Sequence, residues 1–262
     1  EEWQWKRTLS YWIAVTFFSG SLFFSFSSFL MCWPETLGCL EELMTTGGYV
    51  AGKVNFFICT YLMCLETINL TNAAHLKGHK NRRQSPTDID SGDDAASIAS
   101  SASSDSLDSL DGQRFKWWPF HIRTALRNLD TLGAGPWPYV ASAIYFVGVL
   151  TFGVGLVPDF VSMPKQVAHW IGTIAFLFGS IFFTVGGFAE CIENKVFFTF
   201  NLSTGYIGAA LNTIGGIGFL VGAILGFWPE LGFQSCFAYG VGSLIFASGS
   251  AAMIIMWKDE QF

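Results

Sequence analysis

The chain has 262 residues, of which 51% are hydrophobic and only 13% are charged. A typical soluble domain carries about 25% charged residues, so the composition excludes an ordinary water-soluble globular protein. The formal net charge of −6 does not describe the whole chain, because the acidic residues gather in one loop and on a few outer turns. We therefore expect an all-α integral membrane protein whose main partner is the lipid bilayer.

Six apolar stretches are long enough to cross a bilayer, which takes about 20 helical residues. In chain order, these expected spans are residues 10–33, 50–70, 138–157, 168–190, 205–228 and 235–257. The first two spans would form a transmembrane hairpin at 1–72, and the other four would form two more hairpins at 136–262. Between them we expect a disordered, Ser/Asp-rich cytoplasmic loop at 73–113 and an interfacial amphipathic segment at 114–135.

Basic residues gather on one side of the six expected spans. Twelve lie at the two chain ends, in the long loop and in the turn between spans four and five. Only Lys165 and Lys53 lie toward the opposite side. Because cytoplasmic loops carry an excess of Lys and Arg, we predict that both termini and the long loop are cytoplasmic. The chain would be a multi-pass protein of the plasma membrane or of an endomembrane.

The first and fifth spans end on the same tripeptide, Trp-Pro-Glu, which begins at Trp33 and again at Trp228. Trp prefers the headgroup layer, and Pro disfavours helical geometry in the residue before it. The Glu that follows would then lie in water. We interpret the tripeptide as a helix stop at the outer interface, and a ligand-binding outer mouth is the alternative.

A short repeat occurs inside the spans. Residues 20–29 read GSLFFSFSSF, residues 179–188 read GSIFFTVGGF and residues 242–251 read GSLIFASGSA. A looser pattern has Phe four residues after Gly and a small residue three further on. It occurs in all six spans and begins at Gly20, Gly52, Gly148, Gly179, Gly215 and Gly242. These positions share one helix face, which predicts a helix-packing stripe and three parallel two-helix hairpin repeats. A pore or substrate path is the alternative.

The stretch HWIGTIAFLFGSIFFTVGGFAECIE at 169–193 resembles the YrhK-like membrane domain, a short two-helix module with a Gly-Ser-aliphatic-x-Phe core. The likeness covers mainly the fourth span, with echoes in the first and sixth. The resemblance implies a helical hairpin in the membrane. It implies no activity, cofactor or site residue.

The long loop begins with a basic cluster that lies next to the end of the second span. Lys77, Lys80, Arg82 and Arg83 form this cluster, and Ser85 follows it as a candidate phosphosite. Such a cluster attracts anionic lipids, and a phosphate on Ser85 would weaken that attraction. A solvated tether is the alternative, and the loop could also bind a protein partner or a second copy of the chain.

The segment at 114–135 mixes basic and aromatic residues. Its apolar side is formed by Ile122, Ala125, Leu126 and Leu129. This pattern predicts a short helix that lies on the inner leaflet and leads into the third span. The mixture could also suggest nucleic-acid binding, but we expect no nucleic-acid partner so close to a transmembrane span.

Four polar residues within the spans are candidates for an ion or proton path, because such residues are costly in lipid. Lys53 and Asn55 lie in the outer half of the second span, Glu66 near its inner end and Glu190 at the inner end of the fourth. Both glutamates follow the proline of their own hairpin by 32 residues. A path would require both to face the bundle interior; alternatively they mark the inner water boundary.

The remaining features point away from enzyme chemistry. Cys32, Cys39 and Cys236 fall at or beyond the outer face, and one disulfide among them would require a lumenal or extracellular side. The sequence contains no phosphate loop, nucleophile elbow or catalytic triad, so we expect no catalytic residue, metal or cofactor. We predict a non-enzymatic membrane protein of organising or regulatory role, and a small-solute or ion transporter or channel is the alternative.

Overall fold

The computed structural model describes residues 5–70, 115–133 and 135–259, and within these ranges every regular element is helical. The six long helices are α1 (Trp5–Leu30), α2 (Glu41–Ile68), α6 (Trp137–Val154), α8 (Lys165–Glu193), α9 (Thr204–Leu225) and α10 (Gly232–Asp259). Shorter elements are α5 (Ile122–Thr131), α7 (Val157–Phe160) and the 3-10 turns η1 (Pro34–Thr36), η2 (Gly38–Leu40) and η3 (Pro229–Leu231). The part of the chain described here holds six helices long and apolar enough to span a membrane.

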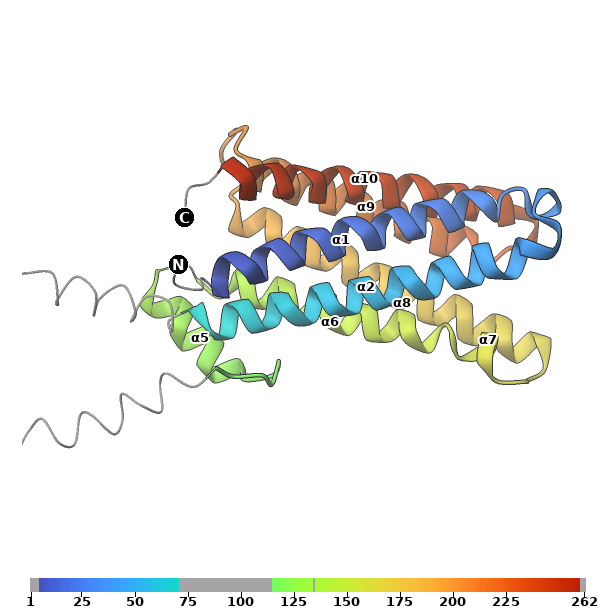
Figure 1. The fold of residues 1–262 in the computed structure, drawn as a ribbon, viewed down its shortest axis with the longest axis horizontal. Helices are drawn as coiled ribbons and strands as arrows, with labels where there is room; N and C mark the ends of the chain where they lie inside the picture. The colour runs from blue at the N-terminus through green and yellow to red at the C-terminus, as the bar shows by residue number, and fades with distance from the viewer. Residues whose placement is uncertain (1–4, 71–114, 134, 260–262) are drawn as a thin grey trace, which may run out of the picture.

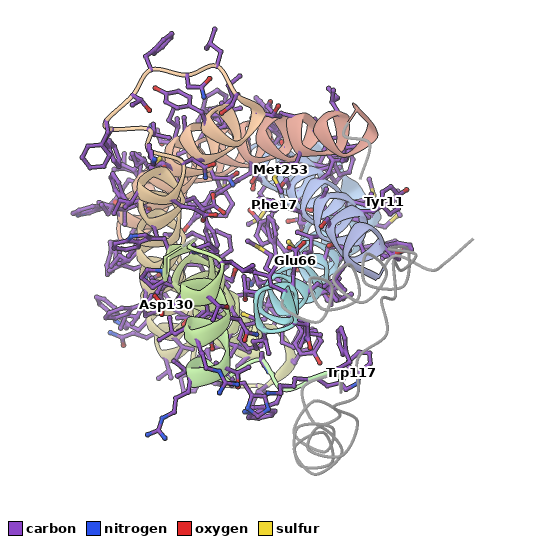
Figure 2. The ribbon with its side chains drawn as sticks, turned by 90° about the vertical axis from the view of Figure 1, so that its left-hand side faces the viewer. Tyr11, Phe17, Glu66, Trp117, Asp130 and Met253 are labelled. Atoms are coloured by element: carbon purple, nitrogen blue, oxygen red, sulfur yellow. The ribbon has the colours of Figure 1, made fainter. Side chains whose placement is uncertain are left out.

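The six long helices form a closed ring. Each packs against two neighbours, in the order α1, α2, α6, α8, α9, α10 and back to α1. They run side by side along the long axis (Figure 1), and Figure 2 shows the ring from one end. The start of α1 and the end of α10 lie at the same end as α5, which we call the terminal end. The turns with η1, α7 and η3 lie at the opposite end, which we call the loop end.

The second helix is longer than the sequence predicted. It begins at Glu41 instead of residue 50, and its first turn holds Glu41 and Glu42. Acidic side chains stabilise the positive N-terminal end of a helix, and the helix continues through Gly47 and Gly48, which precede the predicted span. Lys53 is therefore the thirteenth of 28 residues in α2. It lies near the middle of the helix, in the half toward the loop end.

The two Trp-Pro-Glu tripeptides end their helices in the same way. α1 ends at Leu30 and α9 at Leu225, in each case three residues before the Trp. The Pro then begins a 3-10 turn, η1 or η3. Trp33 and Trp228 are about half exposed. The predicted helix stop is therefore confirmed for both copies.

Glycines and phenylalanines of the looser pattern pack reciprocally within each hairpin. A Cβ atom added to Gly52 of α2 would lie 2.5 Å from Cδ2 of Phe24 of α1, and one added to Gly20 would lie 3.4 Å from Cδ1 of Phe56. The other hairpins repeat this exchange: Gly148 meets Phe183, Gly179 meets Phe152, Gly215 meets Phe246 and Gly242 meets Phe219. Each glycine thus leaves room for the phenylalanine of its partner helix.

The six phenylalanines of this pattern meet at the centre of the ring. They are Phe24, Phe56, Phe152, Phe183, Phe219 and Phe246, each at most 2% exposed. The ring centroid of Phe183 lies 5.3 Å from that of Phe152 and 6.2 Å from that of Phe219. Phe219 in turn lies 5.9 Å from Phe24. These side chains fill the centre of the ring, and we call them the phenylalanine layer.

The outside of the ring is apolar. One example from each long helix is Phe26, Val54, Leu150, Phe178, Val221 and Leu244, which are 44% to 52% exposed. A water-soluble protein rarely exposes so much contiguous apolar surface, whereas lipid tails solvate it. Exposed tryptophans flank this surface, with Trp33, Trp170 and Trp228 toward the loop end and Trp117, Trp118 and Trp137 toward the terminal end. Trp prefers the two membrane–water interfaces.

One side of the short helix α5 packs against the end of α2, and the other side is exposed. Ala125 and Leu129 are buried and pack with Ile68 at the end of α2. The Asn128 side-chain amide donates a 2.8 Å hydrogen bond to the Ile68 carbonyl. Ile122, which the sequence analysis placed on the same apolar side, is exposed. The amphipathic helix is thus present, and part of its apolar side covers the terminal end of the ring.

Residues 71–114 lie outside the described part of the chain. The predicted loop at 73–113, its basic cluster and Ser85 all fall in this segment. These features stay predictions from the sequence.

The Gly–Phe exchange makes a prediction for stability. Changing Gly52→Ala would put a methyl group 2.5 Å from the buried Phe24 ring and 3.2 Å from the Gly20 carbonyl oxygen. Such overpacking costs about 1–3 kcal/mol, more than the gain of about 1 kcal/mol in helix propensity. We expect a lower melting temperature in detergent. The control Gly47→Ala, whose Cβ would meet only Leu43 Cδ1 at 3.6 Å, should melt at or above wild type. Equal melting of the two variants would contradict the exchange.

Candidate functional site

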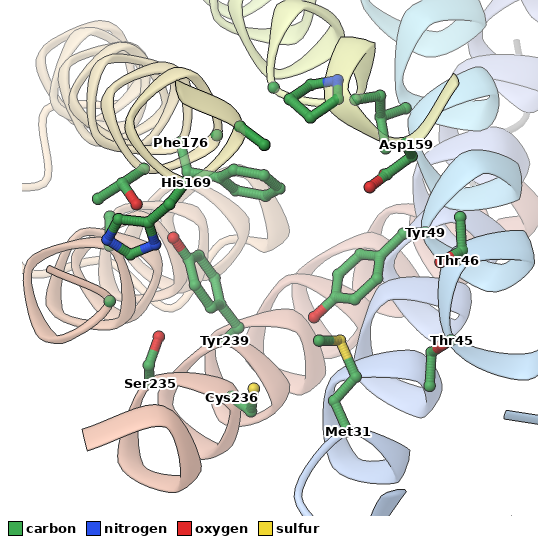
Figure 3. A pocket seen from close by; sticks show the side chains of 18 residues that line it. Met31, Thr45, Thr46, Tyr49, Asp159, His169, Phe176, Ser235, Cys236 and Tyr239 are labelled. Atoms are coloured by element: carbon green, nitrogen blue, oxygen red, sulfur yellow. The ribbon is translucent and has the colours of Figure 1, made fainter. Parts of the chain in front are cut away.

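A vestibule lies on the ring axis at the loop end. Its volume is about 490 Å³, and its lining comes from α2, α7, α8, α9 and α10 and from the turns that follow α1 and α6. Figure 3 shows Tyr49 of α2 and Tyr239 of α10 facing each other across this space. His169 near the start of α8 and Asp159 of α7 also line the vestibule. A cavity of this size can hold a small organic molecule.

Lys53 lies one helical turn from Tyr49 on α2 and is 5% exposed. Its Nζ lies 4.5 Å from the ring centroid of Phe176, which lines the vestibule. Phe176 packs against Phe152 of the phenylalanine layer at 5.5 Å. The Lys53 Nζ is buried and has no hydrogen-bond partner. Asp159 is near enough to act on Lys53 electrostatically.

Several hydroxyl groups around the vestibule are already engaged. The Tyr49 hydroxyl lies 2.8 Å from the Ser28 hydroxyl in a shared hydrogen bond. The Ser235 hydroxyl donates to the Gly222 carbonyl at 2.8 Å, and the Thr45 hydroxyl donates to the Glu41 carbonyl at 2.6 Å. These bonds hold the walls in place, so the vestibule is largely preformed.

The six cysteines are free thiols. Cys32 is buried and donates weakly to the Phe233 carbonyl of α10 at 3.8 Å. Burial raises the pKa of the Cys32 thiol above its ordinary value, so this thiol stays protonated and unreactive at neutral pH. Cys39 is exposed and Cys236 is half-buried. The disulfide considered among these three residues is not formed.

Three carboxylates gather toward the terminal end, and we call them the acidic cluster: Glu66 of α2 and Glu190 and Glu193 of α8. The Glu190 carboxylate accepts a 2.8 Å hydrogen bond from the Asn212 amide of α9. The Ser10 hydroxyl of α1 donates to the Glu66 carboxylate at 2.5 Å. Glu66 acts electrostatically on Glu193, and both Glu66 and Glu190 act on the buried Cys59. Figure 2 shows Glu66 near the interior of the ring.

The four candidate path residues do not converge on one site. Asn55 accepts a 2.8 Å hydrogen bond from the Ser19 hydroxyl and donates to a carbonyl of its own helix, so it joins α1 to α2. Along α2, Lys53 lies on the loop side of Phe56, whereas Glu66 lies on its terminal side. The phenylalanine layer therefore separates the cation from the acidic cluster, a separation that spacing along the chain did not predict.

The packed phenylalanines also change the expected equivalence of the glutamates. Glu66 follows Phe56 by ten residues, and the residue ten after Phe183 is Glu193, not Glu190. The interval from the hairpin proline to its phenylalanine is three residues longer in the second hairpin than in the first. Counting from the prolines therefore paired Glu66 with Glu190, which lies three residues, nearly one helical turn, before its structural counterpart Glu193.

The residues that build the vestibule were mostly missed by the sequence analysis. Tyr49, His169, Phe176 and Tyr239 are single residues in separate apolar stretches, and no spacing links them. One signal did point to this region. The repeated Trp-Pro-Glu tripeptide marked the outer ends of two spans, and a ligand-binding mouth was the alternative interpretation.

Comparisons with protein-family models, with curated proteins and with solved structures found no match. Among the described residues, no group of three His, Cys, Asp or Glu side chains is placed to hold a metal ion. The class defined by the fold is that of a polytopic membrane protein with six apolar helices.

The hydrogen bond between Glu190 and Asn212 makes a second prediction. Asn212→Leu removes the amide donor from the Glu190 carboxylate and should destabilise the protein by about 1–3 kcal/mol, the usual cost of an unsatisfied polar group. Thermal unfolding in detergent measures this loss. In a Glu190→Gln background the loss should shrink, because a neutral amide tolerates a missing partner better. An equal loss in both backgrounds would show that Asn212 acts through packing alone.

Proposed function

We propose that the chain is a non-enzymatic integral membrane protein that organises or regulates partners or lipids through its loop at 73–113. The observation that supports this role over a channel is the phenylalanine layer. Six side chains, one from each long helix and each at most 2% exposed, fill the ring axis. An open channel needs a wet path along that axis, and this packing disfavours one.

The proposal includes three parallel hairpin repeats, each of them a copy of a YrhK-like two-helix module. Support comes from the reciprocal Gly–Phe exchange, which takes the same form in α1–α2, α6–α8 and α9–α10. Each hairpin also begins at the terminal end and turns at the loop end (Figure 1). A duplicated module would have this arrangement.

The proposed orientation places the terminal end, with both chain ends, in the cytoplasm. Lys116, Arg123 and Arg127 belong to the segment around α5, and Lys195 belongs to the turn between α8 and α9. At the loop end the corresponding turns hold no Lys or Arg, and Lys165 is the first residue of α8. The excess of basic residues at the terminal end supports this orientation under the positive-inside rule. The membrane would be the plasma membrane or an endomembrane.

A second candidate function is transport of a small solute or ion. The vestibule with Lys53 lies on one side of the phenylalanine layer, and Glu66 and Glu190 lie on the other. Alternating access exposes one site to each side of the membrane in turn, and polar groups on both sides of the layer could mark the two halves of such a path. Transport would then need the layer to open during each cycle.

Flux through reconstituted protein separates the two functions. Under the organising role, liposomes containing the purified wild-type chain should pass protons, Na⁺, K⁺ and Cl⁻ no faster than empty liposomes, because the ring axis is filled. The matched variant is Glu66→Gln/Glu190→Gln, which keeps the size of both side chains and removes their charge. Proton or ion flux in wild type that this variant abolishes while still folded would replace the organising role by transport.

The basic cluster of the loop makes a separate prediction about lipid partners. Full-length protein in neutral vesicles should tether added vesicles that contain phosphatidylserine, and Ala at Lys77, Lys80, Arg82 and Arg83 should reduce tethering strongly. Each basic residue near an anionic surface contributes about 1 kcal/mol. Ser85→Asp should weaken tethering as a phosphate would, and Ser85→Ala serves as its control. Light scattering measures the clustering. Unchanged tethering by the four-residue variant would leave a protein partner or a second copy of the chain as the loop's target.

A further inference from the structure

The vestibule and Lys53 together form a site that the organising role does not use. The phenylalanine layer closes the vestibule from the acidic cluster, and the vestibule lies toward the loop end, where Met31, Asp159 and Gly226 line it. The helices that flank the loop in the chain, the end of α2 and α5, lie at the opposite end of the ring. The site can therefore be tested independently of the loop.

The buried ammonium group of Lys53 lacks a hydrogen-bond partner, which indicates that a ligand could supply one. Burying an ammonium group is costly even after relaxation, and the Lys53 Nζ has no hydrogen-bond partner. Its contact with the Phe176 ring at 4.5 Å is a cation–π interaction, which returns part of that cost. Asp159 acts on it from the rim without a direct hydrogen bond. Neither the aromatic ring nor the rim carboxylate therefore supplies a hydrogen-bond acceptor to the Lys53 ammonium group.

Lys53 does not itself line the vestibule but lies against the lining residue Phe176, so the vestibule walls limit which ligand could reach it. Phe176, Tyr239, Met31 and Ala223 supply apolar and aromatic surface. The one carboxylate among the lining residues is Asp159, which disfavours a ligand with two negative charges. A single ammonium group cannot offer the several donors that phosphate recognition usually uses. The site is thus matched to one negative charge on an apolar body.

We infer that the vestibule binds a monocarboxylate, whose carboxylate pairs with the Lys53 ammonium group and whose apolar part packs against Phe176 and Tyr239. The volume of about 490 Å³ suits a small organic acid. Such a carboxylate has two sources with the same chemistry: a water-soluble acid that enters from the loop end, or a fatty acid from the bilayer leaflet at that end.

Binding of octanoate to the full-length protein in nanodiscs tests this site. Titration calorimetry should show octanoate binding. Octanol keeps the alkyl chain without the charge, and its affinity should be lower by about tenfold or more, as expected for a lost charge-assisted hydrogen bond. Lys53→Met should weaken octanoate binding by a similar factor. The matched control is Lys165→Met, because Lys165 is an exposed lysine at the same end; it should bind as wild type.

A second pair of variants tests the site without altering Lys53. Gly172 lines the vestibule, and a Cβ added there would meet only the Gly155 carbonyl oxygen, at 3.9 Å, so Gly172→Leu should fold and fill the cavity. Octanoate binding should fall by about tenfold or more. The control Gly153→Leu adds the same side chain at a position with nothing within 4 Å and should bind normally.

The outcomes are distinguishable. Loss of octanoate binding in Lys53→Met or in Gly172→Leu, with both controls intact, supports the site. A preference for octanoate over palmitate then assigns a water-soluble acid, and the reverse preference assigns a fatty acid. Three results overturn the site: equal binding of octanoate and octanol, undiminished octanoate binding in both Lys53→Met and Gly172→Leu, or no octanoate binding to wild type. None of these results depends on vesicle tethering or ion flux.

Discussion

The exchange of a phenylalanine for a glycine across each helical hairpin is the contact on which the rest of the structure depends. Helices in a bilayer gain nothing by excluding water from one another, so close packing must hold them together. Gly20, Gly52 and their counterparts leave the space that a partner phenylalanine occupies, and each aromatic pair adds about 0.5–1.5 kcal/mol. The same six rings then meet on the axis. The contact that forms each hairpin therefore also joins the three hairpins into one ring.

Filling the axis divides the polar groups of the membrane interior into two sets. Lys53 lies with Tyr49 and Tyr239 on the loop side of the phenylalanine layer. Glu66 and Glu190 lie on the terminal side, where hydroxyl and amide donors from neighbouring helices hold them. Opposite charges at this depth would attract strongly if nothing lay between them. Because a layer of buried rings separates them, each set keeps its own chemistry, and the two ends of the ring can serve different purposes.

The sequence predicted the features that depend on local composition, and it did not predict those that depend on which helices pack together. Six apolar stretches and the Gly–Phe spacing were readable because bilayer thickness and helix periodicity are fixed quantities. Spacing gives the face of a helix but not the helix it meets, so the reciprocal exchange was not predictable. The early start of α2 at Glu41 put Lys53 near the middle of that helix, and three extra residues between the start of α8 and Phe183 displaced the match of Glu66 to Glu193. The vestibule draws its lining from α2, α7, α8, α9, α10 and the turns between helices, and no chain-local pattern records that.

Helix α2 connects the two ends of the ring that the phenylalanine layer separates. Lys53 lies at its middle beside the vestibule, and its last turn is fastened to the segment that resumes after the loop. The Asn69 side chain accepts from the Lys116 backbone amide at 2.9 Å and donates to the Lys116 carbonyl at 3.0 Å, and Asn128 of α5 donates to the Ile68 carbonyl. The described residues on either side of the loop are thus held together at the terminal end of α2. One continuous helix therefore joins the side of the vestibule to these flanking residues, whereas a solute moving along the ring axis would have to pass six buried rings.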